Sequence, residues 1–212
     1  MKLDKKSLLL YAVTDRTWLK DRKLADDVEQ ALQGGATFVQ LREKDASFDE
    51  FVEQAKEVKA VCKKHGVPFV INDNIEVALA VDADGVHVGQ SDMEAGSVRE
   101  KIGPDKIIGV STRTVEEALL AKERGADYLG VGAIFNTSTK LDASEVSFQE
   151  LRGICGTVQL PVVAIGGISL DNIEELIGTG IDGVAVVSAL FGAKDIKKAS
   201  EELKEKVERV VN

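Results

Sequence analysis

The chain has 212 residues, and its 27 Lys and Arg against 36 Asp and Glu give a formal charge of −9 at pH 7. This acidic balance argues against a nucleic-acid binder, which needs clustered basic side chains to neutralise phosphates. The longest apolar run, residues 8–13, is far shorter than the roughly 18 residues of a membrane span, and no signal-peptide cleavage site follows it. We therefore expect a cytoplasmic protein with no nucleic-acid and no membrane partner. A homo-oligomer is left open.

Taken in chain order, short β-branched runs alternate with longer stretches of helical period. The pattern predicts helices over 48–65, 115–124, 170–177 and 194–211, and eight strands over 8–14, 38–42, 69–72, 85–88, 107–111, 128–131, 162–165 and 183–187. No linker or composition shift divides the chain, so a single domain over residues 1–212 is expected. Eight β-α units in this length favour an α/β fold, the single-domain (β/α)8 TIM barrel, over a doubly wound sheet, which usually has fewer strands.

A weak internal repeat supports this strand count. One pattern of helix exit and strand entry recurs around Ala36, Ala83, Ala126 and Ile181, at spacings of 47, 43 and 55 residues. Each spacing corresponds to about two β-α units of a barrel. The four copies are therefore assigned to the even-numbered strands.

The carboxyl end of the second predicted strand carries a first set of candidate site residues, because catalytic groups of such barrels gather at strand ends. The segment reads Gln40-Leu41-Arg42-Glu43-Lys44, and strand alternation places Gln40 and Arg42 on one face, opposite Leu41. Two cations and an amide at a barrel mouth suit an anion such as a diphosphate. A solvated charge cluster with Glu43 as a partner accounts for the same residues equally well.

Two carboxylates, Asp73 and Asp92, follow the third and fourth predicted strands. Adjacent parallel strands lie roughly 4.8 Å apart, so these side chains would face each other across a small gap. Mg2+ suits that arrangement, since it takes one or two carboxylates and completes its shell with water and phosphate oxygens. Helix capping explains either aspartate on its own. His87, inside the fourth strand, is expected to be a hydrogen-bonded core residue.

The later strand ends are rich in hydroxyls and glycine. Ser111 ends the fifth predicted strand, and the loop Thr137-Ser138-Thr139-Lys140 follows the sixth. That loop suits a phosphate, and it equally fits a flexible polar loop. The last two strands lead into Gly166-Gly167 and Val187-Ser188, where such barrels recurrently bind phosphate through closely approaching backbone N–H groups. We expect a phosphate site there.

In this order, the strand ends resemble the thiamine-phosphate synthase (thiamine-phosphate pyrophosphorylase) family. The matching segments are residues 11–16, 40–44, 71–73, 85–92, 109–111, 137–140, 166–168 and 187–189. The resemblance implies a transferase of thiamine biosynthesis on a (β/α)8 barrel. It would condense 4-amino-2-methyl-5-(diphosphooxymethyl)pyrimidine with 4-methyl-5-(2-phosphooxyethyl)thiazole, giving thiamine phosphate and pyrophosphate with Mg2+ as cofactor.

The resemblance also implies a role for each candidate residue. The metal ligands would be Asp73 and Asp92. The implied catalytic residues are Arg42, Lys44, Ser111 and Lys140. The pyrimidine diphosphate would be bound by Gln40, Leu41, Arg42, Glu43, Lys44, Asn72, Ser111 and Lys140, and the thiazole phosphate by Thr137, Ser138, Thr139, Gly167, Val187 and Ser188. Three positions depart from the family, which commonly has His in place of Arg113 and Pro in place of Ala133 and Asn136.

The implied reaction needs no general base. The leaving pyrophosphate gains negative charge as its C–O bond breaks, so cations should bind it more tightly in the transition state. The electron-rich pyrimidine delocalises the positive charge on its methylene carbon, and the thiazole nitrogen, held by its phosphate, then attacks.

Two alternatives remain open. A sister thiazole tautomerase on the same barrel needs the phosphate site but not the Asp73 and Asp92 pair, Lys44 or Lys140, so their joint presence favours the synthase. A catalytically silent barrel that senses phosphorylated metabolites is the other alternative, since a fold does not determine a function.

Overall fold

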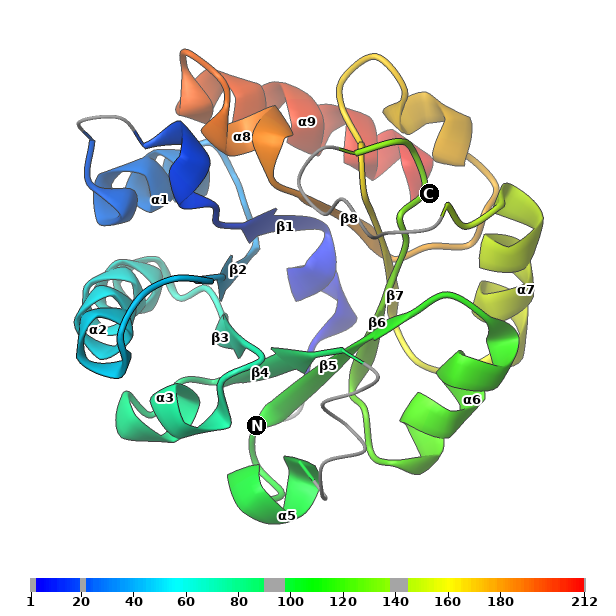
Figure 1. Ribbon diagram of the computed structural model, residues 1–212. Helices are drawn as coiled ribbons and strands as arrows, with labels where there is room; N and C mark the ends of the chain where they lie inside the picture. The colour runs from blue at the N-terminus through cyan, green and yellow to red at the C-terminus, as the bar shows by residue number, and fades with distance from the viewer. Residues whose placement is uncertain (1–2, 20–21, 90–97, 138–144, 212) are drawn as a thin grey trace.

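The computed structural model describes residues 3–19, 22–89, 98–137 and 145–211. Within these ranges, eight parallel strands close into a barrel in chain order, with β1 pairing to both β2 and β8, and helices surround the ring (Figure 1). The strands are β1 (Leu10–Val13), β2 (Phe38–Leu41), β3 (Phe69–Asn72), β4 (Gly85–Val88), β5 (Ile107–Thr112), β6 (Tyr128–Val131), β7 (Val162–Ile165) and β8 (Gly183–Val186). The predicted (β/α)8 barrel is confirmed.

The described helices cover the outside of the ring. The α-helices are α1 (Leu24–Gln33), α2 (Phe48–His65), α3 (Ile75–Ala80), α5 (Val98–Ile102), α6 (Val115–Glu123), α7 (Phe148–Thr157), α8 (Ser188–Phe191) and α9 (Ile196–Val210), and the 3-10 helices are η1 (Lys5–Leu8), η2 (Arg16–Trp18) and η3 (Ile173–Leu176). The predicted helix over 48–65 agrees with α2 at both ends, because Ser47 and Glu50 form a capping box at its start and Gly66 adopts the left-handed conformation after it.

Two sequence predictions of local structure are wrong. The apolar run from residue 8 does not begin a strand, because η1 occupies residues 5–8 and its Leu8 packs inside the barrel ahead of β1. The helix predicted over 170–177 is only the short η3. There the side chain of Asn172 accepts from the backbone N of Ser169 (2.8 Å) and donates to the carbonyl of Gly167 (2.9 Å), so it stabilises a turn in competition with a helix.

Strand alternation separates an outer core from an inner one. Val39 and Leu41 of β2 pack with the surrounding helices in the larger hydrophobic cluster. Tyr11, Phe38 and Tyr128 belong to the smaller cluster inside the barrel. Gln40, between the two outward residues of β2, reaches Tyr11 in the interior, as the predicted alternation requires.

The internal repeat has a physical basis at the amino ends of the strands. In each copy, the residue just before an even-numbered strand forms two hydrogen bonds with one residue of the preceding odd-numbered strand. Its backbone N–H donates to that residue's carbonyl, and its side-chain oxygen accepts from the same residue's N–H. The four pairs are Thr37 with Leu10, Asp84 with Phe69, Asp127 with Ile108 and Asp182 with Val162, with N···O distances between 2.7 and 3.0 Å.

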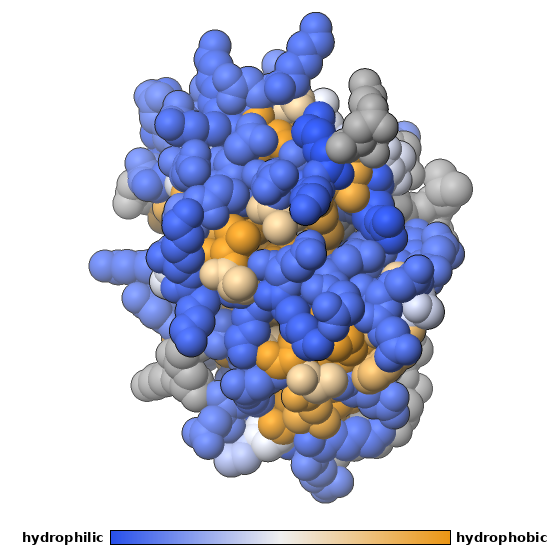
Figure 2. Space-filling model, turned by 90° about the vertical axis from the view of Figure 1, so that its left-hand side faces the viewer, coloured by the Kyte–Doolittle hydropathy of each residue, from blue (hydrophilic) through white to orange (hydrophobic). Residues whose placement is uncertain are grey.

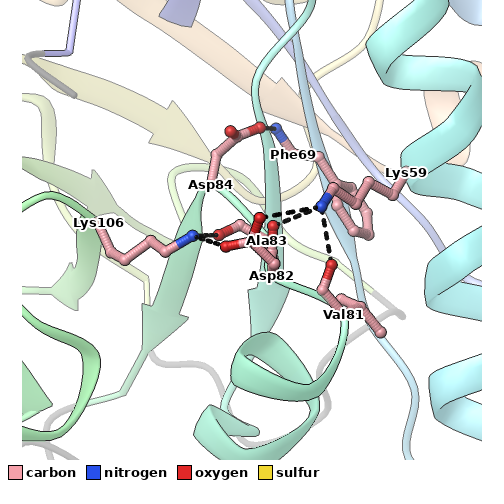
Figure 3. A network of polar contacts seen from close by, with 7 residues as sticks. All are labelled: Lys59, Phe69, Val81, Asp82, Ala83, Asp84 and Lys106. Carbon is pink, nitrogen blue, oxygen red and sulfur yellow. Dashed lines mark hydrogen bonds and ion pairs between the residues drawn. The ribbon is translucent and has the colours of Figure 1, made fainter.

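Figure 3 shows one of these pairs beside the turn that precedes β4. Asp84 accepts from the backbone N of Phe69, while Lys59 approaches the turn from α2 and donates to the carbonyls of Val81 and Asp82. Lys106 approaches from the other side and contacts the carboxylate of Asp82 at 2.5 Å. Because this end of such barrels serves stability rather than chemistry, we assign the network a structural role.

The outer surface formed by α1, α2 and α3 is largely hydrophilic, with smaller separate apolar areas (Figure 2). Large exposed apolar side chains on this side include Phe48 of α2 and Leu79 of α3. Among the described residues, no helix combines the length and apolar character that crossing a bilayer would require.

Candidate functional site

The carboxyl ends of β1 and β2 border a cavity of about 580 Å³. Its lining includes three cations, Arg16, Arg42 and Lys44, and four acids, Asp15, Glu43, Asp45 and Glu50. Lys44 is exposed, whereas Arg42 is partly buried. The cavity therefore offers guanidinium and ammonium groups to an anion, at the place where the sequence predicted them.

The two arginines of this cavity lie beside acids. Arg42 Nη1 lies 3.3 Å from Asp15 Oδ2, and the backbone N of Arg42 donates to Thr14 Oγ1 at 3.0 Å. Arg16 lies 3.8 Å from the carboxylate of Glu43. The side chain of Glu43 is only 4% exposed, and this burial raises its pKa despite the opposing effect of Arg16. An anionic ligand would thus compete with Asp15 for a guanidinium that is already oriented.

Strand β3 places Asn72 and Asp73 at the same mouth. The backbone of Asp73 has a positive φ of 58°, its N–H donates to the carbonyl of His87 on β4, and Asn72 Nδ2 lies 2.7 Å from its Oδ2. The carboxylate is exposed, so a ligand at the mouth can reach it. A carboxylate oxygen is the donor that Mg2+ prefers, and Asp73 therefore fits the predicted metal site.

Within the described ranges, no group of three or more His, Cys, Asp or Glu could hold a metal ion. Asp92, the second predicted ligand, lies outside the described residues.

Strand β5 presents Ser111, which is joined to the barrel interior. His87 Nε2 lies 2.9 Å from Ser111 Oγ, and His87 Nδ1 lies 2.9 Å from the hydroxyl of Tyr128. Tyr128 in turn bonds Tyr11 at 2.7 Å, and Tyr11 accepts from Gln40 Nε2 at 2.6 Å. The expectation that His87 is a hydrogen-bonded core residue is confirmed, and its chain of partners connects two predicted site residues.

Among the described residues, the ends of β6, β7 and β8 bring backbone segments close together. Gly167 has a φ of +64°, and a Cβ at this position would lie 2.4 Å from the carbonyl oxygen of Asn136, so the loops after β6 and β7 approach closely. Thr137 is partly buried beside them. Val187 and Ser188 follow β8 directly and begin α8, with Ser188 exposed.

The β1 loop connects this second region to the cavity. β8 pairs with β1, and the Trp18 ring would lie 3.5 Å from a Cβ placed on Gly192, just after α8. Arg22, which also follows β1, is paired with the fully buried Asp27 at 2.8 Å and contacts the carbonyl of Phe191. The two candidate binding regions therefore adjoin on one side of the mouth.

Among the described residues, Leu41 is a predicted site residue whose side chain does not face the mouth. The side chain of Leu41 is buried in the outer core, which leaves only its backbone for binding. The predicted residues Ser138, Thr139 and Lys140 lie outside the described residues, as does Asp92.

Sequence reasoning missed the aromatic residues behind the site. Tyr11 and Tyr128 were not assigned to it, although both stand at inward positions of strands whose other inward residues are mostly aliphatic. A hydroxyl at such a position needs a buried partner, and this was the signal that could have identified them. The pairing of Asp15 with Arg42 was also missed, because nothing in the local pattern joins residues 27 apart.

The family model, the curated relatives and one solved structure agree on a family. The model of the thiamine monophosphate synthase family matches residues 10–190. The thiamine-phosphate synthase of Clostridium tetani is 53% identical over 194 residues, which cover 92% of this chain and 93% of that protein. The thiamine-phosphate synthase of Pyrococcus abyssi is 47% identical over 207 residues, 98% of each chain. The solved thiamine phosphate pyrophosphorylase of Pyrococcus furiosus has a TM-score of 0.90 at 45% identity, covering 98% of this chain and 99% of that chain.

Proposed function

The chain belongs to the thiamine monophosphate synthase family, and we propose that it joins 4-amino-2-methyl-5-(diphosphooxymethyl)pyrimidine to 4-methyl-5-(2-phosphooxyethyl)thiazole. The products would be thiamine phosphate and pyrophosphate. The observation that carries this proposal is the placement of a cavity with three cations and four acids after β1 and β2, whose lining residue Trp18 lies beside Gly192 at the end of α8. A reaction between a diphosphate and a monophosphate needs two anion sites that adjoin.

The cavity after β2 is the proposed diphosphate site. Arg42 offers a planar fork and Lys44 a mobile point charge, a combination that suits the oxygens of a diphosphate. Asp15 orients Arg42 before the ligand arrives, which reduces the reorganisation needed on binding. As the methylene C–O bond breaks, the leaving group gains charge, so these cations stabilise the transition state more than the bound substrate.

We assign Mg2+ to Asp73 together with Asp92. When bound, Mg2+ would supply positive charge to the leaving pyrophosphate. Asp73 supports the assignment because its residue is exposed, its backbone N–H donates to the His87 carbonyl, and its carboxylate accepts from the side-chain amide of Asn72.

The thiazole phosphate is assigned to the backbone around Gly167 and to Ser188, with Thr137, Ser138, Thr139 and Val187 as further contacts. Gly167 supports this role because only a residue without Cβ fits beside the loop after β6. Holding the phosphate aligns the thiazole nitrogen with the methylene carbon of the other substrate. Since the attacking nitrogen carries no proton, the chain's task is alignment, and no general base is needed.

The test follows pyrophosphate release by the purified full-length protein with both substrates, with and without a chelator. Release that requires both substrates and stops with chelator is expected. A tautomerase would release no pyrophosphate, and a sensing barrel would bind the substrates without turnover. Chelator-insensitive release would contradict the Mg2+ assignment alone.

A matched pair of lysine variants tests the diphosphate site. Lys44→Gln should raise the KM for the pyrimidine diphosphate while leaving the KM for the thiazole phosphate unchanged, because the lost charge faces only the first substrate. Lys56→Gln removes an exposed lysine that pairs with Glu53 on α2, and it should change neither KM. Equal effects of the two substitutions would contradict the assignment of Lys44.

A further inference from the structure

A chain of hydrogen-bonded side chains crosses the inside of the barrel. It runs from Gln40 on β2 through Tyr11 on β1, Tyr128 on β6 and His87 on β4 to Ser111 on β5. The four donor–acceptor distances, in the same order, are 2.6, 2.7, 2.9 and 2.9 Å. We call these five side chains the relay. It joins two groups that stand on different sides of the mouth.

The barrel is built to accommodate the relay. Tyr11 and Tyr128 are 1% and 0% exposed, and burial raises the pKa of both hydroxyls, so each keeps its proton at neutral pH. A Cβ on Gly109 of β5 would lie 2.1 Å from Cζ of Tyr128 and 2.5 Å from Nδ1 of His87. The contact between Tyr128 and His87 therefore occupies the space that a side chain at residue 109 would fill.

The polarity of the relay follows from the donor at its first position. The amide Nε2 of Gln40 can only donate, so the Tyr11 hydroxyl accepts from it and directs its own proton to Tyr128. Tyr128 then donates to Nδ1 of His87, and the imidazole carries its proton on Nε2. That N–H donates to Ser111 Oγ, whose own proton is directed to a partner other than His87.

We propose that His87 is a positioning residue, whose Nε2–H tautomer is set by the Gln40 amide through Tyr11 and Tyr128 and orients the Ser111 hydroxyl as a donor toward the substrate. The proposal rests on the function proposed above and on the contact of Gln40 and Ser111 with the pyrimidine diphosphate that the family resemblance implies. With the opposite amide orientation every hydrogen bond in the relay would reverse, and Ser111 would donate its proton to His87. A donating Gln40 amide therefore directs the Ser111 proton away from His87, so that it can be given to an acceptor atom of the substrate such as a diphosphate oxygen.

The direct test reads the imidazole tautomer by 15N NMR of the full-length protein, and this measurement does not depend on activity. The chain has two histidines, and a His65→Gln variant identifies the signals of His87. The wild type should show Nε2 protonated and Nδ1 unprotonated. A protonated Nδ1, alone or in an imidazolium, would overturn the proposal.

A Gln40→Glu variant tests the coupling along the relay. An ionised carboxylate can only accept, so Tyr11 must donate to it and the tautomer of His87 should reverse to Nδ1–H. The comparison is made at a pH where the 13C shift of the new carboxyl shows it to be ionised. Adding Tyr128→Phe removes the hydroxyl in the middle of the relay, so the tautomer of His87 should no longer depend on residue 40. An unchanged tautomer beside an ionised carboxylate would contradict the proposal.

A double-mutant cycle gives a second measurement if Gln40→Glu does not fold. Tyr128→Phe should lower kcat/KM for the pyrimidine diphosphate about tenfold, the size expected for one lost directed hydrogen bond. In a Ser111→Ala background the same change should have almost no further effect, because the relay acts through that hydroxyl. Equal losses in both backgrounds would mean that Tyr128 only supports packing. Failure of the proposed function would be visible separately, as absence of pyrophosphate release beside an Nε2–H tautomer.

Discussion

Replacing Asp127 tests whether the repeated contacts at the amino ends of the strands stabilise the barrel. Its Oδ2 accepts from the backbone N of Ile108 and from Arg99 Nη2, both at 2.8 Å. Asp127→Ala removes both contacts and leaves the N–H of a fully buried residue without its acceptor. Asp127→Asn keeps an acceptor oxygen and removes mainly the charge.

The two variants should differ by the cost of the unpaired N–H. A buried donor without a partner costs about 1–3 kcal/mol. The ion pair contributes about 0–1 kcal/mol, because the side chains of Arg99 and Asp127 are 26% and 37% exposed. We therefore expect a loss of about 1–4 kcal/mol for Asp127→Ala and of about 0–1 kcal/mol for Asp127→Asn.

Thermal unfolding followed by circular dichroism measures this difference. For a chain of this size, each kcal/mol corresponds to about 2–4 °C in Tm. Asp84 and Asp182 make the equivalent contact in other copies of the repeat. For each of them, the Ala variant should have a lower Tm than the Asn variant. If the Ala and Asn variants of Asp127 unfold at the same temperature, the bond to Ile108 is not the source of the stability and the reasoning is refuted.

Three further predictions concern pH, backbone and charge geometry. Hydrogen bonds, of which the one to His65 has the largest effect, lower the pKa of Glu29 from 4.5 to about 2. The ionised Glu29 therefore stabilises the fold fully above pH 4.5, and this contribution is lost as the pH falls toward 2. The urea midpoint of Glu29→Gln should thus lie below wild type at pH 7, and the gap should close between pH 4.5 and 2; a constant gap would contradict the linkage. Gly167→Ala should lower Tm and raise the KM for the thiazole phosphate, because its φ of +64° and the close loop after β6 exclude a Cβ; unchanged values would refute this. Arg42→Lys keeps the charge but loses the fork, so steady-state kinetics should show a higher KM for the pyrimidine diphosphate only, whereas equal changes in both KM values would argue for a structural role.

Much of the fold could be predicted because its determinants are local. Strands β3, β4, β6 and β7 and helix α2 agree with the predicted ranges at both ends. β-branched runs, a capping box and a glycine after the helix act over a few residues, and each is readable in a short window. The helix predicted over 170–177 failed because periodicity does not report that Asn172 bonds the turn before it.

The candidate site was predictable to the level of strand ends. Gln40, Arg42, Asn72 and Ser111 were placed at the mouth because side chains alternate along a strand and parallel strands end together. Their partners were not predictable. Asp15 beside Arg42 depends on the course of the loop after β1, which no pattern in the segment encodes.

The sequence by itself determined the element order, the inward and outward faces of the strands and the residue types at the mouth, since these depend on spacing along the chain. Only the tertiary structure decided which inward residues meet. Tyr11 and Tyr128 are 117 residues apart, and their hydroxyls come within 2.7 Å because the register of the closed barrel brings them to the same level. The relay exists because barrel closure joins residues of five strands, and that relation has no counterpart in any short stretch of sequence.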